Sequence, residues 1–227
     1  MGTVPIEEWN GNQTLPYRVQ IVTSEVGTVI RNNAVDIPRQ ISHREAMDVF
    51  IAWVVLSFGF SIMFARVYTA SYPLILVGSF VTAGTGFVIH EMAHKFTAIH
   101  YGYWAEFVKD TRMLILSVVT AIFGFMIAAP GATQIYGMAM ARDTLGRIAA
   151  AGPVSNIILA LPFALLALIM PGFLIWKMGF QINAMLALFN MIPVFVLDGK
   201  KVWDWDHTAF GVIAGIAGLL FLASMVM

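Results

Sequence analysis

Residues 74–99 read LILVGSFVTAGTGFVIHEMAHKFTAI, an apolar run that is interrupted near its end by His90, Glu91 and His94. About 20 apolar residues in a helix cross the hydrocarbon core of a bilayer, so this run predicts a membrane-spanning helix. Side chains four residues apart share one face of a helix, which lets the two imidazoles bind one metal ion. Because polar groups are costly at this depth, their presence indicates a functional site.

The composition predicts an integral membrane protein. Of the 227 residues, 59% are hydrophobic and 11% are charged, and the mean hydropathy is +0.79, which is unlike soluble domains. The net charge is zero, so no nucleic-acid partner is expected. The chain has no cysteine, which leaves His, Asp and Glu as the available metal ligands.

We expect an all-α polytopic membrane protein with a short β element near its active site. Counted one by one, the apolar runs would make six spans: 46–65, 74–99, 113–129, 148–170, 178–193 and 209–227. The membrane-embedded domain is predicted to cover residues 46–227.

Residues 1–45 are polar and predict a small cap, expected to be cytoplasmic. Within it, the alternating stretches 17–23 and 27–30 predict a short hairpin. Ser42 and Glu45 match a capping box at the start of the first membrane helix.

A catalytic zinc ion usually has three protein ligands, so His90 and His94 need one partner. We select Asp198, in the sequence LDG at the end of the 178–193 run. At 1.5 Å per residue, His90 lies roughly 24 Å and Asp198 roughly 30 Å along their helices, so each is near the finishing end. The less favoured candidates are Asp110, Asp204, Asp206 and His207.

Bringing Asp198 to His90 requires both helices to finish on the same membrane face. The runs 148–170 and 178–193 already supply two crossings, so the run 113–129 cannot be a third. We therefore predict five spans and a re-entrant segment at 113–129, which Gly124 and Pro130 could break. Six full spans remain the alternative.

The charges favour five spans. With a cytoplasmic amino terminus, eleven of the 13 Lys and Arg residues fall inside and only Arg66 and Lys177 fall outside. Six spans would change this distribution to eight against five. We therefore expect a multi-pass protein of the cell membrane whose active site opens to the cytoplasm.

Three ordered motifs carry a family resemblance: HEMAH at 90–94, AGPVSN at 151–156 and NMIPVFVLDG at 190–199. With them the chain resembles the site-2 protease family of intramembrane zinc metalloproteases over about residues 74–203. It is most similar to the compact archaeal and bacterial members without an inserted PDZ domain. One departure is an apolar insertion before Pro130, where family members soon reach a turn and a β-strand.

The resemblance implies a hydrolase with one zinc ion per chain, held by His90, His94 and Asp198. It implies that Glu91 activates the metal-bound water. It also implies that Asn156, Asn190 and Pro193 shape the substrate cleft.

The implied partner is a transmembrane protein substrate in the lipid bilayer, cleaved in regulated intramembrane proteolysis. The stretch 132–136 could hold an unwound substrate by strand addition. No feature of the sequence sets an oligomeric state. A rival reading is a non-catalytic scaffold or transporter-like protein with a structural metal or a histidine proton relay.

Overall fold

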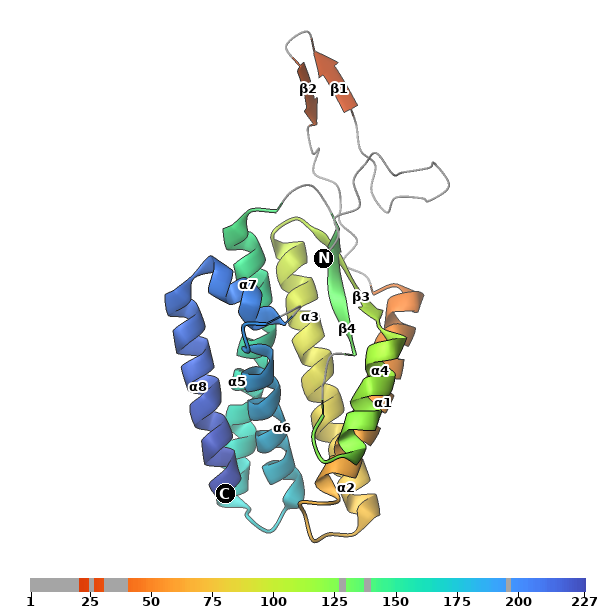
Figure 1. Ribbon diagram of the computed structural model, residues 1–227, viewed down its shortest axis with the longest axis vertical. Coiled ribbons are helices and arrows are strands. Elements are labelled where there is room, and N and C mark those ends of the chain that lie inside the picture. The colour runs from red at the N-terminus through yellow and green to blue at the C-terminus, as the bar shows by residue number, and fades with distance from the viewer. Residues whose placement is uncertain (1–20, 25–26, 31–40, 127–129, 137–139, 195–196) are drawn as a thin grey trace.

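A computed structural model describes residues 21–24, 27–30, 41–126, 130–136, 140–194 and 197–227, and it is mostly helical (Figure 1). Eight α-helices follow along the described chain: α1 (His43–Phe64), α2 (Tyr72–Ser79), α3 (Thr85–His100), α4 (Thr111–Ile122), α5 (Arg142–Ile169), α6 (Leu174–Asn190), α7 (Asp198–Trp205) and α8 (His207–Val226). The strands are β1 (Ile21–Ser24), β2 (Gly27–Ile30), β3 (Trp104–Lys109) and β4 (Gly131–Tyr136).

Four of the described helical segments are long and apolar enough to cross a membrane: His43–Phe64, Tyr72–His100, Arg142–Ile169 and His207–Val226. The 17 residues of α6 extend about 26 Å, and this helix packs along α5. The helical membrane fold is therefore confirmed, with four described helices of spanning length; α6, which corresponds to the expected span at 178–193, is shorter than these.

The second span is continuous from Tyr72 to His100 but contains a π-helical turn, η2 (Phe80–Gly84). Beside this turn the indole Nε1 of Trp53 on α1 donates to the Phe80 carbonyl at 3.1 Å. A Cβ at Gly84 would lie 1.6 Å from the same Nε1. Glycine at this position therefore allows α1 to pack closely against the helix that carries the HEMAH motif.

Most of the predicted re-entrant segment 113–129 lies in α4, whose 12 residues extend about 18 Å, and residues 127–129 lie outside the described residues. The chain enters through β3 and returns through β4, which pair antiparallel from Trp104↔Tyr136 to Lys109↔Gly131. The Asp110 N–H also donates to the Pro130 carbonyl at 2.8 Å. Since the two ends of the segment lie together, it makes no net crossing, and its interpretation as a sixth full span is wrong.

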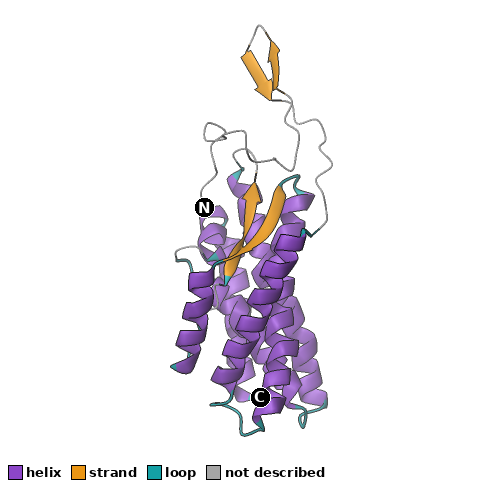
Figure 2. Cartoon of the chain, turned by 90° about the vertical axis from the view of Figure 1, so that its right-hand side faces the viewer, coloured by secondary structure: helices purple, strands orange, loops and turns teal. Residues whose placement is uncertain are grey.

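The β element near the site has a partner strand, β3, that the sequence pattern does not predict. The expected strand is β4, and β3 pairs with it over six residues. Ala105 and Phe107 of β3 are fully buried. Figure 2 shows the two strands lying along the helices toward one end of the bundle.

The hairpin predicted before the first span is confirmed, because β1 and β2 pair antiparallel from Ile21↔Ile30 to Ser24↔Gly27. Residues 1–20 and 31–40, which make up most of the predicted cap, lie outside the described residues.

The capping box is half formed. The Ser42 hydroxyl accepts from the Glu45 N–H at 3.0 Å. The Glu45 carboxylate does not complete the box, because it accepts from the Phe107 N–H of β3 at 3.0 Å and pairs with Lys95 of α3. The Glu45 side chain therefore forms a long-range ion pair in place of the local hydrogen bond of the capping box.

Candidate metal centre

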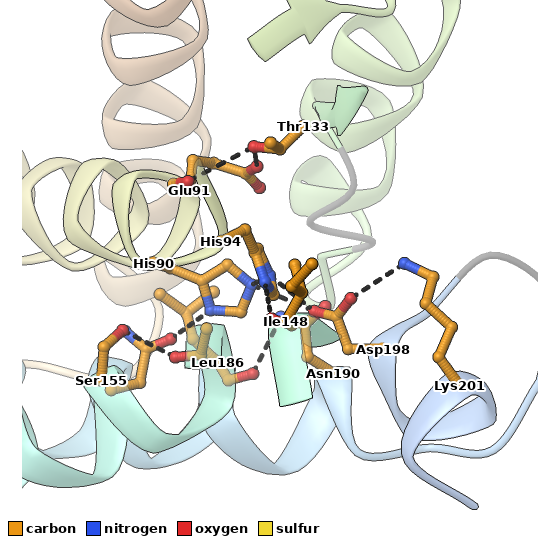
Figure 3. Close-up of polar contacts among 12 residues, drawn as sticks. His90, Glu91, His94, Thr133, Ile148, Ser155, Leu186, Asn190, Asp198 and Lys201 are labelled. Atoms are coloured by element: carbon orange, nitrogen blue, oxygen red, sulfur yellow. Dashed lines mark hydrogen bonds and ion pairs between the residues drawn. The ribbon is translucent and has the colours of Figure 1, made fainter. Parts of the chain in front are cut away.

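Three side chains from two distant parts of the chain converge at one point. His94 Nε2 lies 3.1 Å from His90 Nε2 and 3.0 Å from Asp198 Oδ2, and His90 Nε2 lies 3.3 Å from the same oxygen. All three residues are buried. The structure thus brings together the three residues predicted as ligands, as Figure 3 shows.

Helix α3 places the two imidazoles, and α5 orients them. His90 Nδ1 lies 2.7 Å from Asn156 Oδ1, and His94 Nδ1 lies 2.7 Å from the Ile148 carbonyl. Since oxygen accepts in both contacts, each ring donates from Nδ1, which leaves each Nε2 free to bind a cation.

The glycine of the AGPVSN motif provides the space that the rings occupy. A Cβ at Gly152 would lie 2.3 Å from His94 Nε2 and 2.6 Å from His90 Nε2. Any side chain at position 152 would therefore displace the imidazoles.

Asp198 is the first residue of the short helix α7, which follows the membrane helices α5 and α6. A Cβ at the next residue, Gly199, would lie 2.3 Å from the Met191 carbonyl, so glycine lets α7 fold back onto the end of α6. Lys201, one turn later, pairs with Asp198 Oδ1 at 3.1 Å.

The electrostatic surroundings favour the anionic form of Asp198. Burial by itself raises the pKa of the carboxyl, but His94, His90 and Lys201 together hold this pKa well below its usual value. One oxygen faces the imidazoles and the other faces the lysine. One Asp198 oxygen is therefore aimed at the point where the two Nε2 atoms meet.

Glu91 lies beside this cluster, and a residue of strand β4 holds its side chain in place. The Thr133 hydroxyl of β4 lies 2.8 Å from Glu91 Oε2, to which it donates, and 3.3 Å from the Glu91 carbonyl (Figure 3). Glu91 is buried, with 7% of its surface exposed. Strand β4 thus fixes the carboxylate that the family resemblance implies to activate water.

A cavity of about 80 Å³ adjoins these residues and has room for several water molecules. Glu91, Asp198, Thr133 and Asn190 are among its lining residues, together with apolar side chains such as Leu145. The site therefore offers both titratable groups and space for water.

The residues predicted to shape a substrate cleft occupy three different environments. Asn190 lines the cavity, and its amide donates to the Leu186 carbonyl at 3.0 Å. Asn156 is fully buried behind His90. Pro193 is exposed on the segment between α6 and α7.

The less favoured candidates for the third ligand have other contacts. Asp110 caps α4 by accepting from the backbone of Arg112 at 2.8 Å. Asp204 pairs with Lys200 on an exposed face. Asp206 caps α8 through the Ala209 N–H at 2.8 Å. None of these three belongs to the His90, His94 and Asp198 cluster found among the described residues.

Three contributors were missed at the sequence level. Thr133 lies in the stretch 132–136, which was expected only to hold substrate by strand addition, and the alternation of a strand would have suggested that it faces inward. Lys201 was counted only among the cytoplasmic charges, although it pairs with Asp198. Lys95, counted in the same way, is fully buried. Only the fold brings Thr133 and Lys95 to their partners, whereas Lys201 and Asp198 lie three residues apart on α7, a spacing that could have indicated their pairing.

Two imidazole nitrogens and one carboxylate oxygen form a donor set that suits catalytic zinc, which keeps a further position for water or substrate. The buried cluster and the adjoining cavity fit that description.

Curated relatives carry names that agree with this donor set. Over 177 residues the chain is 37% identical to "Putative zinc metalloprotease MJ0611" of Methanocaldococcus jannaschii, a match that covers 76% of this chain and 90% of that protein. Over 156 residues it is 29% identical to "Putative zinc metalloprotease Rip3" of Mycobacterium tuberculosis, covering 64% of this chain and 35% of that protein. No protein-family model matches. No solved structure matches either.

The M. jannaschii relative is similar over nearly its whole length, and the match is too long to reflect the HEMAH motif alone. The chain belongs to the site-2 protease family of zinc metalloproteases.

Proposed function

We propose that this protein is an intramembrane zinc metalloendopeptidase that cleaves transmembrane protein substrates within or beside the bilayer. The observation that carries the proposal is the buried His90, His94 and Asp198 cluster on the wall of a cavity shared with Glu91. A structural metal site would have no need of an adjoining cavity or of a fourth, carboxylate-bearing side chain.

Zinc, when bound to one such site per chain, lowers the pKa of water and polarises a scissile carbonyl. Glu91 acts as the general base: its carboxylate takes a proton from the attacking water and passes it to the leaving amine. Thr133 holds one oxygen of that carboxylate by its 2.8 Å hydrogen bond. The other oxygen remains for the proton transfer.

Substrate would bind as an extended segment beside β4. A transmembrane helix hides its carbonyls in its own hydrogen bonds, so it must unwind before hydrolysis. Within the described residues, β3 pairs along one edge of β4, and Ala132 of β4 lines the cavity. Strand addition at the other edge would bring an unwound substrate to Glu91.

The three predicted cleft residues divide by position. Asn190 lines the cavity, which supports its predicted contact with substrate. Asn156 contacts His90, which supports a positioning role instead. A substrate role for Pro193 stays a prediction.

The cavity is proposed to open toward the cytoplasm, in a multi-pass protein of the cell membrane. The support is the excess of Lys and Arg at the end of the bundle where α3 finishes and α5 begins, of which Lys200 and Lys201 are examples.

Replacing Glu91 by Gln tests the mechanism. The variant keeps the metal ligands but loses the base, so zinc content should remain near one per chain while cleavage falls by about 10²–10⁴-fold. The measurement is cleavage of a single-span reporter by purified protein in lipid, with product sequencing and metal analysis. Cleavage at the wild-type rate would refute the role of Glu91.

The ligand assignment is tested by metal analysis of Asp198→Ala, which should lose most of its zinc. Asp204→Ala is the matched control, because Asp204 pairs with Lys200 on the exposed face of the same helix. Zinc bound at full occupancy without any cleavage of membrane substrates would favour the structural-metal alternative.

A further inference from the structure

We propose that Asn183, on α6, is a positioning residue for the metal centre: acting through Asn156, it fixes the ring orientation and tautomer of His90. The inference rests on the proposed zinc site. It adds a residue that belongs to none of the three sequence motifs and does not touch the cluster itself.

The contacts form a chain across three helices. His90 Nδ1 on α3 lies 2.7 Å from Asn156 Oδ1 on α5. Asn156 Nδ2 donates to Asn183 Oδ1 on α6 at 3.0 Å, and also to the Gly86 carbonyl at 3.1 Å. Asn183 Nδ2 donates to the Gly179 carbonyl, one turn earlier on α6, at 2.9 Å.

The direction of these hydrogen bonds is determined by two backbone carbonyls, that of Gly179 beside Asn183 and that of Gly86 beside Asn156. A carbonyl can only accept, so Gly179 requires the NH₂ group of Asn183 and turns its oxygen toward Asn156. Asn156 must then present its own NH₂ group to Asn183, which turns its oxygen toward His90. His90 consequently donates from Nδ1, and its Nε2 carries the free lone pair that a metal requires.

Without Asn183, the Asn156 amide loses one of the two acceptors of its NH₂ group. The alternative amide orientation, with NH₂ toward His90, would then be less costly. In that orientation His90 would accept at Nδ1 and carry its proton on Nε2, where it would block metal binding. Asn183 therefore disfavours the tautomer that cannot bind zinc.

Burial leaves these amide groups without alternative hydrogen-bond partners from solvent. Asn156 and Asn183 have no exposed surface, so water cannot replace a lost partner. Space is also limited, because a Cβ at Gly86 would lie 2.8 Å from Asn183 Oδ1. Glycine at position 86 lets α3 approach α6 closely enough for the chain of amides to form.

The competing explanation is that Asn183 only joins helices, as buried polar residues commonly do in membrane proteins. Helix α6 supplies a matched control in Gln181, whose side-chain oxygen accepts from the Tyr68 hydroxyl at 2.6 Å. This amide also links α6 to another part of the bundle, but it is not connected to His90. A purely structural role predicts the same result for both amides.

The experiment measures zinc affinity of the full-length protein in detergent micelles by competition with a chelator. Asn156→Leu and Asn183→Leu should each weaken zinc binding by about tenfold or more, as is typical for residues that orient a ligating histidine. Gln181→Leu should stay within about twofold of the wild type. Cobalt-substituted Asn183→Leu should also show a changed visible spectrum, because the spectrum reports ligand geometry.

Equal zinc affinities for Asn183→Leu and Gln181→Leu, beside a normal wild-type affinity, would overturn the inference and leave the proposed function intact. A wild-type protein that binds no zinc would instead overturn the proposed function.

Should Asn183→Leu fail to fold, nitrogen NMR of the zinc-free wild type decides, because there the amide network and not the metal sets the tautomer. A proton on Nδ1 of His90 supports the inference, and a proton on Nε2 contradicts it.

Discussion

At the scale of single residues, the metal centre requires a glycine at position 152, because a side chain there would occupy the space of the imidazoles. A Cβ at this position would lie 2.3 Å from His94 Nε2, so Gly152→Ala should force both imidazoles away from Asn156 and Ile148. We expect zinc affinity to fall by more than about tenfold. In the zinc-free protein the gain in helix propensity, about 1 kcal/mol, should offset part of the cost. Chelator competition and thermal unfolding measure the two effects separately.

Gly211→Ala is the control for this prediction. Gly211 lies in α8, and a Cβ there would meet no atom within 4 Å. It should gain helix propensity in the same way without changing zinc affinity. Equal zinc affinities for the two variants would show that the space beside the imidazoles is not required.

Sequence reasoning could find the residues of the cluster, but not the residues that support them. The spacing of His90 and His94 predicts a shared face because a helix fixes it locally. Asp198 was found from its depth in the membrane. In contrast, Thr133 and Asn183 act across distances that only the packed elements close.

At the scale of elements, a buried ion pair joins α1, α3 and β3. Glu45 and Lys95 have no exposed surface, and Glu45 also accepts from the Phe107 N–H. Glu45→Gln would leave the Lys95 ammonium buried without its counterion, which typically costs about 3–5 kcal/mol. We expect a clear loss of stability of that order in thermal or denaturant unfolding in micelles.

Asp204→Asn is the matched control, since the exposed pair of Asp204 and Lys200 should contribute less than about 1 kcal/mol. The double variant Glu45→Gln, Lys95→Met should recover part of the lost stability, because no unpaired charge then remains buried. If Glu45→Gln unfolded no more easily than Asp204→Asn, the ion pair would not be what joins these elements.

Elements were predictable where a long-range constraint could be stated in advance. The re-entrant segment followed from the requirement that Asp198 reach His90, and the paired ends at Asp110 and Pro130 satisfy it. Strand β3 was not predicted because its six residues, which lie between two apolar runs, are too few to show a clear alternation of polar and apolar side chains. The π-helical turn η2 was equally inaccessible, since the same apolar sequence suits a regular α-helix.

At the scale of the whole molecule, the paired strands determine how many times the chain crosses the bilayer between α3 and α5. Trp104 pairs with Tyr136, so the end of α3 and the start of α5 lie at the same end of the bundle. Helices α1 and α5 each run from that end to the other, where Val67 and Gly172 follow them (Figure 1).

Because the chain has no cysteine, single cysteines can report each position without a background. Tyr101→Cys and Arg142→Cys should react with a membrane-impermeant maleimide from the same side, which the charge distribution predicts to be the cytoplasm. Val67→Cys and Gly172→Cys should react only from the opposite side. Labelling of intact cells and of inverted vesicles makes the comparison. If positions 101 and 142 were labelled from opposite sides, the chain would have to cross the bilayer an odd number of times between them. Asp198 could then no longer reach the membrane face on which His90 lies.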